Sequence, residues 1–161
     1  MKTPKVFNGP VEVGLRTLVM LIEAYPAGLD LQQLVTLDYI IVHSGDVTGG
    51  PTSLHPPSPL RAGEVAVRRT LIENGLHLYA CHGLITRGFG PDGIRYFAED
   101  TAASFIDAMQ AKYVTDLRSR AEWAFESFGL LPSDELSQVL TESMSRWRAE
   151  FAVLEGEEDS T

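Results

Sequence analysis

Several side chains in this 161-residue chain have the chemistry to bind a metal ion. His77 and Cys81 are four residues apart, a spacing that places both on one face of a helix. Other candidates flank this pair or lie near a glycine- and proline-rich segment: His82, His43, Asp46 and His55. A protein zinc site needs three or four ligands, usually in recognisable pairs. The spacing here supplies one pair, so we expect no metal and no other cofactor, with Cys81 as a small core residue and the histidines partly buried or solvated.

Ser44, Ser53 and Cys81 raise the question of nucleophilic catalysis. The sequence contains no G-x-S-x-G motif, and nothing in it orders a base or an oxyanion hole. Gly49 and Gly50 lack the lysine and hydroxyl residue of a phosphate-binding G-x-x-x-x-G-K-[ST] loop. The abundant carboxylates cluster in C-terminal helices, where they most simply solvate outer faces. We therefore predict that the chain has no catalytic residues and is not an enzyme.

Arginines offer a different chemistry, the binding of nucleic-acid phosphates. Residues 61–96 carry five arginines against three acidic residues, a net charge of +2. The whole chain carries −9, with a pI of about 4.8, which argues against a protein dominated by nucleic-acid binding. One interpretation is DNA contact inside a larger complex, and the other is ordinary surface arginines paired with Glu64 or Glu73. The candidate DNA contacts are Arg68, Arg69, Arg87 and Arg95.

Composition limits the class of protein. Hydrophobic residues make up 44% of the chain, enough for a core in one domain. No apolar run reaches the roughly 18–20 residues of a membrane span, and Arg16 and Glu23 interrupt the longest candidate. The first ten residues are too polar for a signal peptide. Cys81 is a single cysteine, so no intrachain disulfide can form, and we expect a cytoplasmic protein.

A long loop separates two helical segments. It runs from Ser44 to Pro59, 16 residues that include three glycines and four prolines. Structureless loops above about 12 residues are usually functional or disordered. The loop is therefore either a spacer or a contact surface.

Helical periodicity predicts the elements around this loop. We expect a first helix over Val11–Ala24 and a second over Leu31–Val42, begun by a capping box of Asp30 and Gln33. The second helix is apolar on most sides, which is typical of a buried helix or one in a partner interface. After the loop, Ala62–His82 is either one long helix or two short ones divided at Gly75.

A β-hairpin should follow, because alternating segments flank the turn Pro91–Asp92–Gly93. Further helices are expected over Thr101–Gln110 and Lys112–Phe128, and over a last stretch from an N-cap at Ser133 to Leu154. The order predicts a mostly α fold with a small hairpin, similar to a winged helix-turn-helix. We assign residues 1–100 to that domain, with its loop at 44–59, residues 101–154 to a C-terminal helical extension, and residues 155–161 to a disordered acidic tail.

Association with another protein is a further possibility. The apolar second helix, the long loop, and Trp147 and Phe151 near the end of the last helix all offer contact area, and aromatic residues are enriched at interfaces. The same residues would also serve to complete the core. Periodicity does not separate these alternatives.

One combination of residues is far more specific than these short patterns. The segment Asp38–Arg69 holds D-Y-x-x-V-H-S-G-D and, further on, the S-L-H-P loop; GLITRGF and PDGIRYFAEDTAASFI follow. In this combination the chain resembles the middle component of bacterial ABC-three-component systems, the Lamassu-type defence systems, and is most similar to middle component 2. The resemblance extends from about Asn8 to Phe151.

The resemblance implies a small, non-enzymatic, winged-helix-like adaptor. Its partners would be an SMC/Rad50-like ABC ATPase and an effector, often a nuclease, and it would link the sensing of foreign DNA to that effector. It implies no catalytic residues, so the matching loop positions become candidates for a partner interface: His43, Ser44, Asp46, Ser53, Leu54, His55, Pro56 and Arg61. The alternative is a stand-alone winged-helix regulator that binds DNA.

Overall fold

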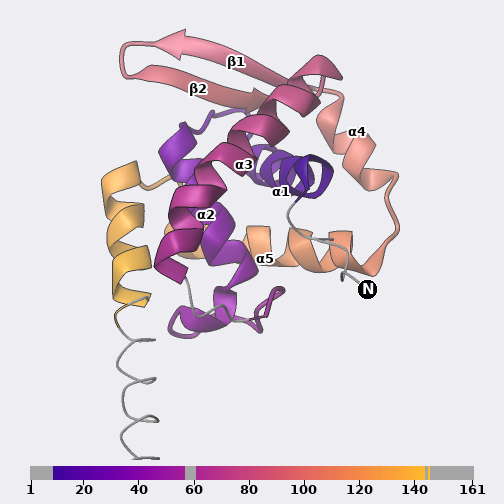
Figure 1. Cartoon of the computed structure of the whole chain (residues 1–161). Coiled ribbons are helices and arrows are strands. Elements are labelled where there is room, and N and C mark those ends of the chain that lie inside the picture. The colour runs from indigo at the N-terminus through magenta and orange to yellow at the C-terminus, as the bar shows by residue number, and fades with distance from the viewer. Residues whose placement is uncertain (1–8, 57–60, 144, 146–161) are drawn as a thin grey trace, which may run out of the picture.

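A computed structural model describes residues 9–56, 61–143 and 145, and of residues 61–66 it describes the backbone alone. Within these residues the chain is mostly helical and carries one two-stranded antiparallel hairpin, as predicted. Figure 1 shows the hairpin at one end of the helical body and the segment after α2 at the opposite end. The order of elements is compatible with a winged helix-turn-helix, which remains a prediction.

The first two helices form where the sequence predicts them. α1 spans Pro10–Ala24, with proline at its first turn, where a missing N–H costs nothing. α2 spans Leu31–Val42 and begins with the predicted capping box, since Asp30 accepts from the Gln33 N–H and Gln33 accepts from the Asp30 N–H. Nearly all of α2 is buried, as its apolar composition requires.

The third helix is continuous. After a short 3-10 turn, η1 (Ser44–Asp46), and the rest of the loop, α3 spans Arg61–Cys81 without a break at Gly75. A Cβ atom at Gly75 would lie 2.8 Å from the backbone nitrogen of Gly14 in α1, which is closer than real Cβ atoms come. Gly75 therefore lets two helices approach closely, and the alternative of two short helices is wrong.

The hairpin extends from the end of α3. β1 (Ile85–Gly90) pairs with β2 (Gly93–Ala98) in a register that sets Arg87 opposite Tyr96 and Phe89 opposite Ile94. Leu29 forms an isolated antiparallel bridge to Tyr96 on the other side of β2. β2 is thus the inner strand and β1 the outer one, as Figure 1 shows.

The helices that follow pack back on the first ones. α4 (Ala102–Asp107) is shorter than predicted, whereas α5 (Lys112–Phe128) has the predicted bounds and ends at Gly129 with φ +59°. Residues 133–143 are helical, and Ser133 is a helical residue rather than the predicted N-cap, because the Pro132 carbonyl accepts from the Leu136 N–H. Trp147, Phe151 and the predicted tail 155–161 lie outside the described residues.

A single hydrophobic cluster joins the elements. It includes Leu18 of α1, Ile40 of α2, Ile72 of α3 and Leu117 of α5. The described parts of segments 1–100 and 101–154 therefore share one core, and their assignment as separate units stays a prediction. In the part of the chain that is described, no helix has the length and apolar character needed to cross a membrane.

Candidate partner interface

Three charged side chains meet in the interior. Asp38 of α2 lies between Arg16 of α1 and Arg68 of α3. The Arg16 Nε donates to Asp38 Oδ1 at 2.8 Å and its Nη2 donates to Oδ2 at 3.1 Å, while the Arg68 Nη1 also donates to Oδ2. Arg16 is 1% exposed, Asp38 0% and Arg68 6%. Both charge types are thus paired where water cannot solvate them.

Electrostatics in this cluster favours the ionised forms. Burial by itself would raise the pKa of Asp38, but the two guanidiniums and their hydrogen bonds outweigh it and hold that pKa well below its usual range. Burial would likewise lower the pKa of Arg16, yet the Asp38 carboxylate leaves it raised. Arg16 and Asp38 are therefore ionised at every ordinary pH, and removing Asp38 would take away the carboxylate that both buried guanidiniums contact.

Aromatic and histidine rings surround the cluster on the loop side. The His43 ring lies 4.8 Å from the Tyr39 ring and 6.3 Å from the His55 ring, measured between centroids. His55 stacks on Tyr113 of α5, and its Nε2 is 3.0 Å from the Tyr113 hydroxyl. Burial and the nearby Arg16 charge lower the pKa of His55 to about 4. His55 is therefore neutral at physiological pH and joins the loop to α5.

The loop backbone is fixed by specific hydrogen bonds. The Ser44 hydroxyl donates to the carbonyl oxygens of Pro51 and Thr52, and the Gly45 N–H donates to the Ser53 hydroxyl. The N–H groups of Leu54 and His55 both donate to the Val42 carbonyl, and Arg120 of α5 donates to the Thr52 carbonyl at 2.9 Å. Over residues 44–56 the loop is an ordered structure, so the spacer interpretation does not hold for this part.

The predicted loop residues divide into two groups. His43, Ser44 and His55 are buried and face the core, so they shape the loop and do not themselves present a surface to a partner. Asp46, Ser53 and Leu54 are half-buried, and Pro56 is exposed. The side chain of Arg61 lies outside the described residues, as do residues 57–60. Replacing the whole loop would therefore also remove core contacts.

The loop borders an open groove that sequence reasoning missed. Val47, Thr48 and Gly49 form one wall, and Trp123 and Phe128 of α5 form another. Residues of the last helical segment line its third side: Val139, Glu142 and Ser143. The groove has a volume of about 330 Å³. Trp123 and Phe128 pack edge to face, with centroids 5.9 Å apart. Their five-residue separation along α5 is not the three- or four-residue spacing of neighbours on one helix face, so the spacing carried no signal of this pair.

At the opposite end of the molecule, α3 and the hairpin carry the other predicted arginines. Arg69 is exposed and lies 3.5 Å from Glu73 one turn on. Arg87 is exposed on β1 and stacks over the Phe89 ring at 5.3 Å, and Arg95 donates to the Gly28 carbonyl at 3.3 Å. Arg68 is committed to Asp38 in the interior, so it does not join them. The set of candidate DNA contacts on this surface is thus Arg69, Arg87 and Arg95.

A groove of about 640 Å³ runs between α3 and the hairpin. Leu76, Ile85 and Tyr96 supply apolar lining, and Glu73 and Arg87 supply opposite charges. His77 and Cys81 also line it, with the Cys81 sulfur 3.8 Å from the His77 Nε2. Cys81 is exposed, contrary to the expected core position, because it lies on the outer face of α3. Among the described residues, no three metal-binding side chains come together.

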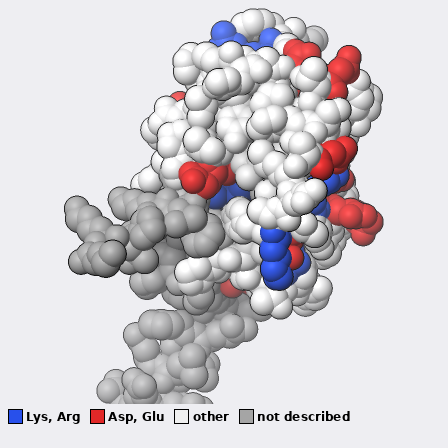
Figure 2. Space-filling model, turned by 90° about the vertical axis from the view of Figure 1, so that its right-hand side faces the viewer, with Lys and Arg blue, Asp and Glu red and all other residues white. Residues whose placement is uncertain are grey.

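Surface charge is scattered on the face seen in Figure 2. Basic side chains lie at the top, at the height of the hairpin in Figure 1, and again in the lower half of this face, where acidic side chains lie close to them. No continuous basic area appears on this face.

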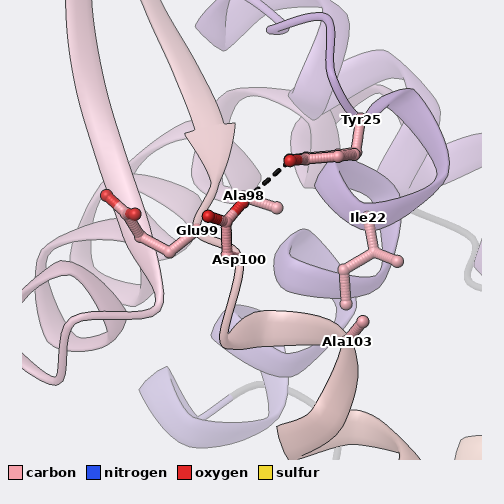
Figure 3. A pocket seen from close by; sticks show the side chains of 6 residues that line it. All are labelled: Ile22, Tyr25, Ala98, Glu99, Asp100 and Ala103. Atoms are coloured by element: carbon pink, nitrogen blue, oxygen red, sulfur yellow. Dashed lines mark hydrogen bonds between the residues drawn. The ribbon is translucent and has the colours of Figure 1, made fainter.

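A smaller hollow, of about 150 Å³, lies where β2 leads into α4. Figure 3 shows Tyr25, Ile22, Ala98 and Ala103 around it, and the Tyr25 hydroxyl donates to Asp100 Oδ1 at 2.7 Å. This hydrogen bond raises the pKa of Tyr25. The contact joins the residue after α1 to the segment that follows β2.

Comparison with known proteins bears on these surfaces. The family model described as ABC-three component (ABC-3C) system Middle Component 2 matches residues 6–150. Searches of curated proteins and of solved structures return no match. The matched range includes the buried cluster, the loop, the hairpin and α5.

Proposed function

The chain belongs to the family of Middle Component 2 proteins of ABC-three component systems, and from this we propose that it is a non-enzymatic adaptor subunit of such a system. In this proposal the adaptor works in the cytoplasm and connects an SMC/Rad50-like ABC ATPase to an effector such as a nuclease. The assembly would be a Lamassu-type system that defends against phage or plasmids.

The observation that carries the proposal is the family match over residues 6–150. Membership as a middle component of a three-component system implies partnership with the other components of that system. Grooves at both ends of the molecule, beside the loop and beside the hairpin, support a connecting role because each offers apolar and polar groups to a partner.

The test is co-purification of the tagged chain with the ATPase and the effector of the same system. We expect a stable complex with the ATPase. A chain that elutes alone beside the untagged ATPase, in low salt and with ATP present, would contradict the adaptor role.

The loop groove gives a sharper version of this test. A Thr48→Arg variant adds bulk and charge at an exposed position without touching the buried His43, Ser44 or His55. Thr115→Arg, at an exposed position of α5, adds the same side chain outside that groove and serves as its matched control. If Thr48→Arg no longer co-purifies with one partner while Thr115→Arg still does, that partner binds at the loop.

A second candidate function is DNA binding by the hairpin end. It is favoured by the exposure of Arg69 and Arg87 on neighbouring elements. The expected result is a salt-dependent shift of duplex DNA that weakens in the Arg69→Ala and Arg87→Ala variants. Absence of any shift at low salt would exclude it for the isolated chain.

A further inference from the structure

The outer edge of the hairpin carries backbone groups that β2 does not use. Tyr96 of β2 exchanges both of its backbone hydrogen bonds with Leu29, at 2.9 and 3.0 Å. Its partner in the register is Arg87. In an antiparallel ladder the N–H and C=O of one residue point to the same side, and successive residues alternate. The backbone groups of Arg87 therefore point away from β2, and those of Phe89 do the same.

A second hydrogen bond confirms this alternation. The Glu99 N–H donates to the Leu84 carbonyl at 2.9 Å, across the base of the hairpin. The backbone hydrogen-bonding groups of Thr86 and Gly88, like the Leu84 carbonyl, thus point toward β2. Those of Ile85, Arg87 and Phe89 point away from it. Within the residues that the structure describes, no strand pairs with this outer edge. An exposed edge of this kind is a template for another strand.

The side chains beside this edge are unusually apolar for a hairpin tip. Phe89 is 76% exposed and its cross-strand partner Ile94 is 41% exposed. Phe89 lies on the same face of the hairpin as Ile85 and Arg87, because these positions differ by an even number along β1, and Ile94 shares that face because it lies directly opposite Phe89. That face borders the groove against α3, whose lining includes Ile85, Arg87 and Tyr96.

From this combination we propose that β1 accepts an extended segment of a partner protein as an added strand. The inference rests on the proposed adaptor function and names where one partner binds. Main-chain hydrogen bonds to Arg87 and Phe89 would supply affinity, and alternate side chains of the segment would enter the groove and supply specificity. The segment carries an apolar residue beside Phe89 and Ile94, and an acidic residue beside Arg87.

The charges of this end favour a protein segment over duplex DNA. Arg68 is paired with Asp38 in the interior, Arg69 is offset by Glu73, and Arg95 is half-buried against the Gly28 carbonyl. Asp92 adds a negative charge at the turn. Among the described residues, Arg87 is the one arginine of the candidate set on the groove face that pairs with no carboxylate. It is a small footprint for phosphate binding but a sufficient partner for one carboxylate.

The test uses the full chain and the ATPase subunit of the same system, followed by the effector. Phe89→Pro removes an outward N–H without breaking a β1–β2 hydrogen bond, which is where proline is tolerated in a strand. Ile94→Pro is the matched control, since it lies opposite Phe89 but directs its N–H to the other edge. We expect Phe89→Pro to weaken co-purification about tenfold or more, because it loses both the outward N–H and a side-chain contact. Ile94→Pro loses only a side-chain contact, so we expect it to weaken co-purification by no more than about threefold.

Hydrogen exchange provides a measurement that does not depend on a variant folding. The Arg87 and Phe89 amides should exchange rapidly in the isolated chain and become protected in the complex, while the Gly88 amide is protected in both. Persistent exchange at Arg87 and Phe89 in a complex that does form would overturn the inference and leave the adaptor function standing. Failure of the wild-type chain to bind either subunit would overturn both.

Two other outcomes would assign the edge to a different occupant. A dimer of the isolated chain that Phe89→Pro converts to a monomer would identify a second copy. A DNA shift that is lost with Arg87→Ala and retained with Phe89→Pro would identify a phosphate backbone. Either result would contradict the proposed partner strand.

Discussion

Arg68 and Arg69 are neighbours in the sequence and have opposite environments. Arg68 turns into the core and pairs with Asp38, whereas the Arg69 side chain is 55% exposed and lies near Glu73 on the surface. One step along an α-helix rotates the side chain by about 100°, which is enough to exchange core for solvent. The same residue type thus stabilises the fold at one position and is available to a partner at the next.

The comparison extends to the two ends of the molecule. At the loop end, polar groups are used in contacts within the chain. His55 contacts Tyr113, Ser44 bonds to the loop carbonyls, and Asp38 pairs with two arginines. At the hairpin end, exposed apolar side chains and an open strand edge remain. Polar residues that look functional in the sequence therefore anchor the loop, while unremarkable hairpin residues form the more accessible surface.

The largest effect that separates the two environments should come from Asp38→Ala. It removes the buried carboxylate that both Arg16 and Arg68 contact, and we expect a loss of about 3–5 kcal/mol in the free energy of unfolding. The matched change outside, Glu73→Ala, should cost less than about 1 kcal/mol because Arg69 stays hydrated. Urea denaturation measures both. Similar losses for the two variants would show that the interior cluster is not desolvated.

The second largest effect should come from acid, which should lower the free energy of unfolding through His55 at the loop end. The pKa of His55 is about 4 in the folded chain against 6.5 for an ordinary histidine, so the unfolded chain binds more protons between these values. The stabilisation is complete above pH 6.5 and declines as the pH falls toward 4, by at most about 3 kcal/mol. Asp38, with its lowered pKa, loses its contribution only below its ordinary value of 3.8.

The control for this pH dependence is His55→Gln, which keeps a polar side chain near Tyr113 but does not titrate. Its stability should vary less between pH 6.5 and 4 than that of the wild type. Denaturation curves at several pH values give the comparison. An unchanged pH slope would assign the acid sensitivity to another group.

A smaller difference should appear between Arg68→Met and Arg69→Met. The first variant removes a hydrogen bond to a buried carboxylate and should cost roughly 1.5–3 kcal/mol, with Arg16 still pairing Asp38. The second should change stability by less than about 0.5 kcal/mol, as surface substitutions usually do. Equal thermal shifts would mean that Arg68 contributes no more than its surface neighbour.

The smallest effect is expected at the hairpin. Arg87→Ala removes an exposed cation–π contact with Phe89, which is worth about 0.5–1 kcal/mol. A thermal melt should therefore change little, even where binding of a partner changes. A large loss of stability would show that the hairpin depends on Arg87 for its fold and would weaken its assignment to a binding surface.

Local sequence signals predicted much of the secondary structure. Asp30 and Gln33 located the start of α2, Pro91–Asp92–Gly93 located the hairpin turn, and Gly129 located the end of α5. Each depends on hydrogen bonds or dihedral angles within a few residues, so the sequence contains the complete signal. Gly75 was ambiguous because its role is to admit Gly14, a residue of another helix.

The surfaces were harder to predict because they too depend on residues that are distant in the sequence. Ser44 and His55 lie in the predicted loop and His43 precedes it, but the direction of their side chains depends on elements that are distant in sequence, such as α5. Trp123 became part of a groove only when α5 packed beside Thr48 and Gly49. Whether the loop or the hairpin binds a partner remains a prediction.

By itself the sequence determined the family, the order of helices and hairpin, and the positions of caps and turns, since these depend on residue type and short-range spacing. Only the tertiary structure decided which arginines are interior, which loop residues face outward, and which strand edge stays open. Those properties depend on the packing of α1, α3 and α5 around α2, where a rotation of one residue on a helix, or of one position in a strand, changes a side chain from buried to exposed.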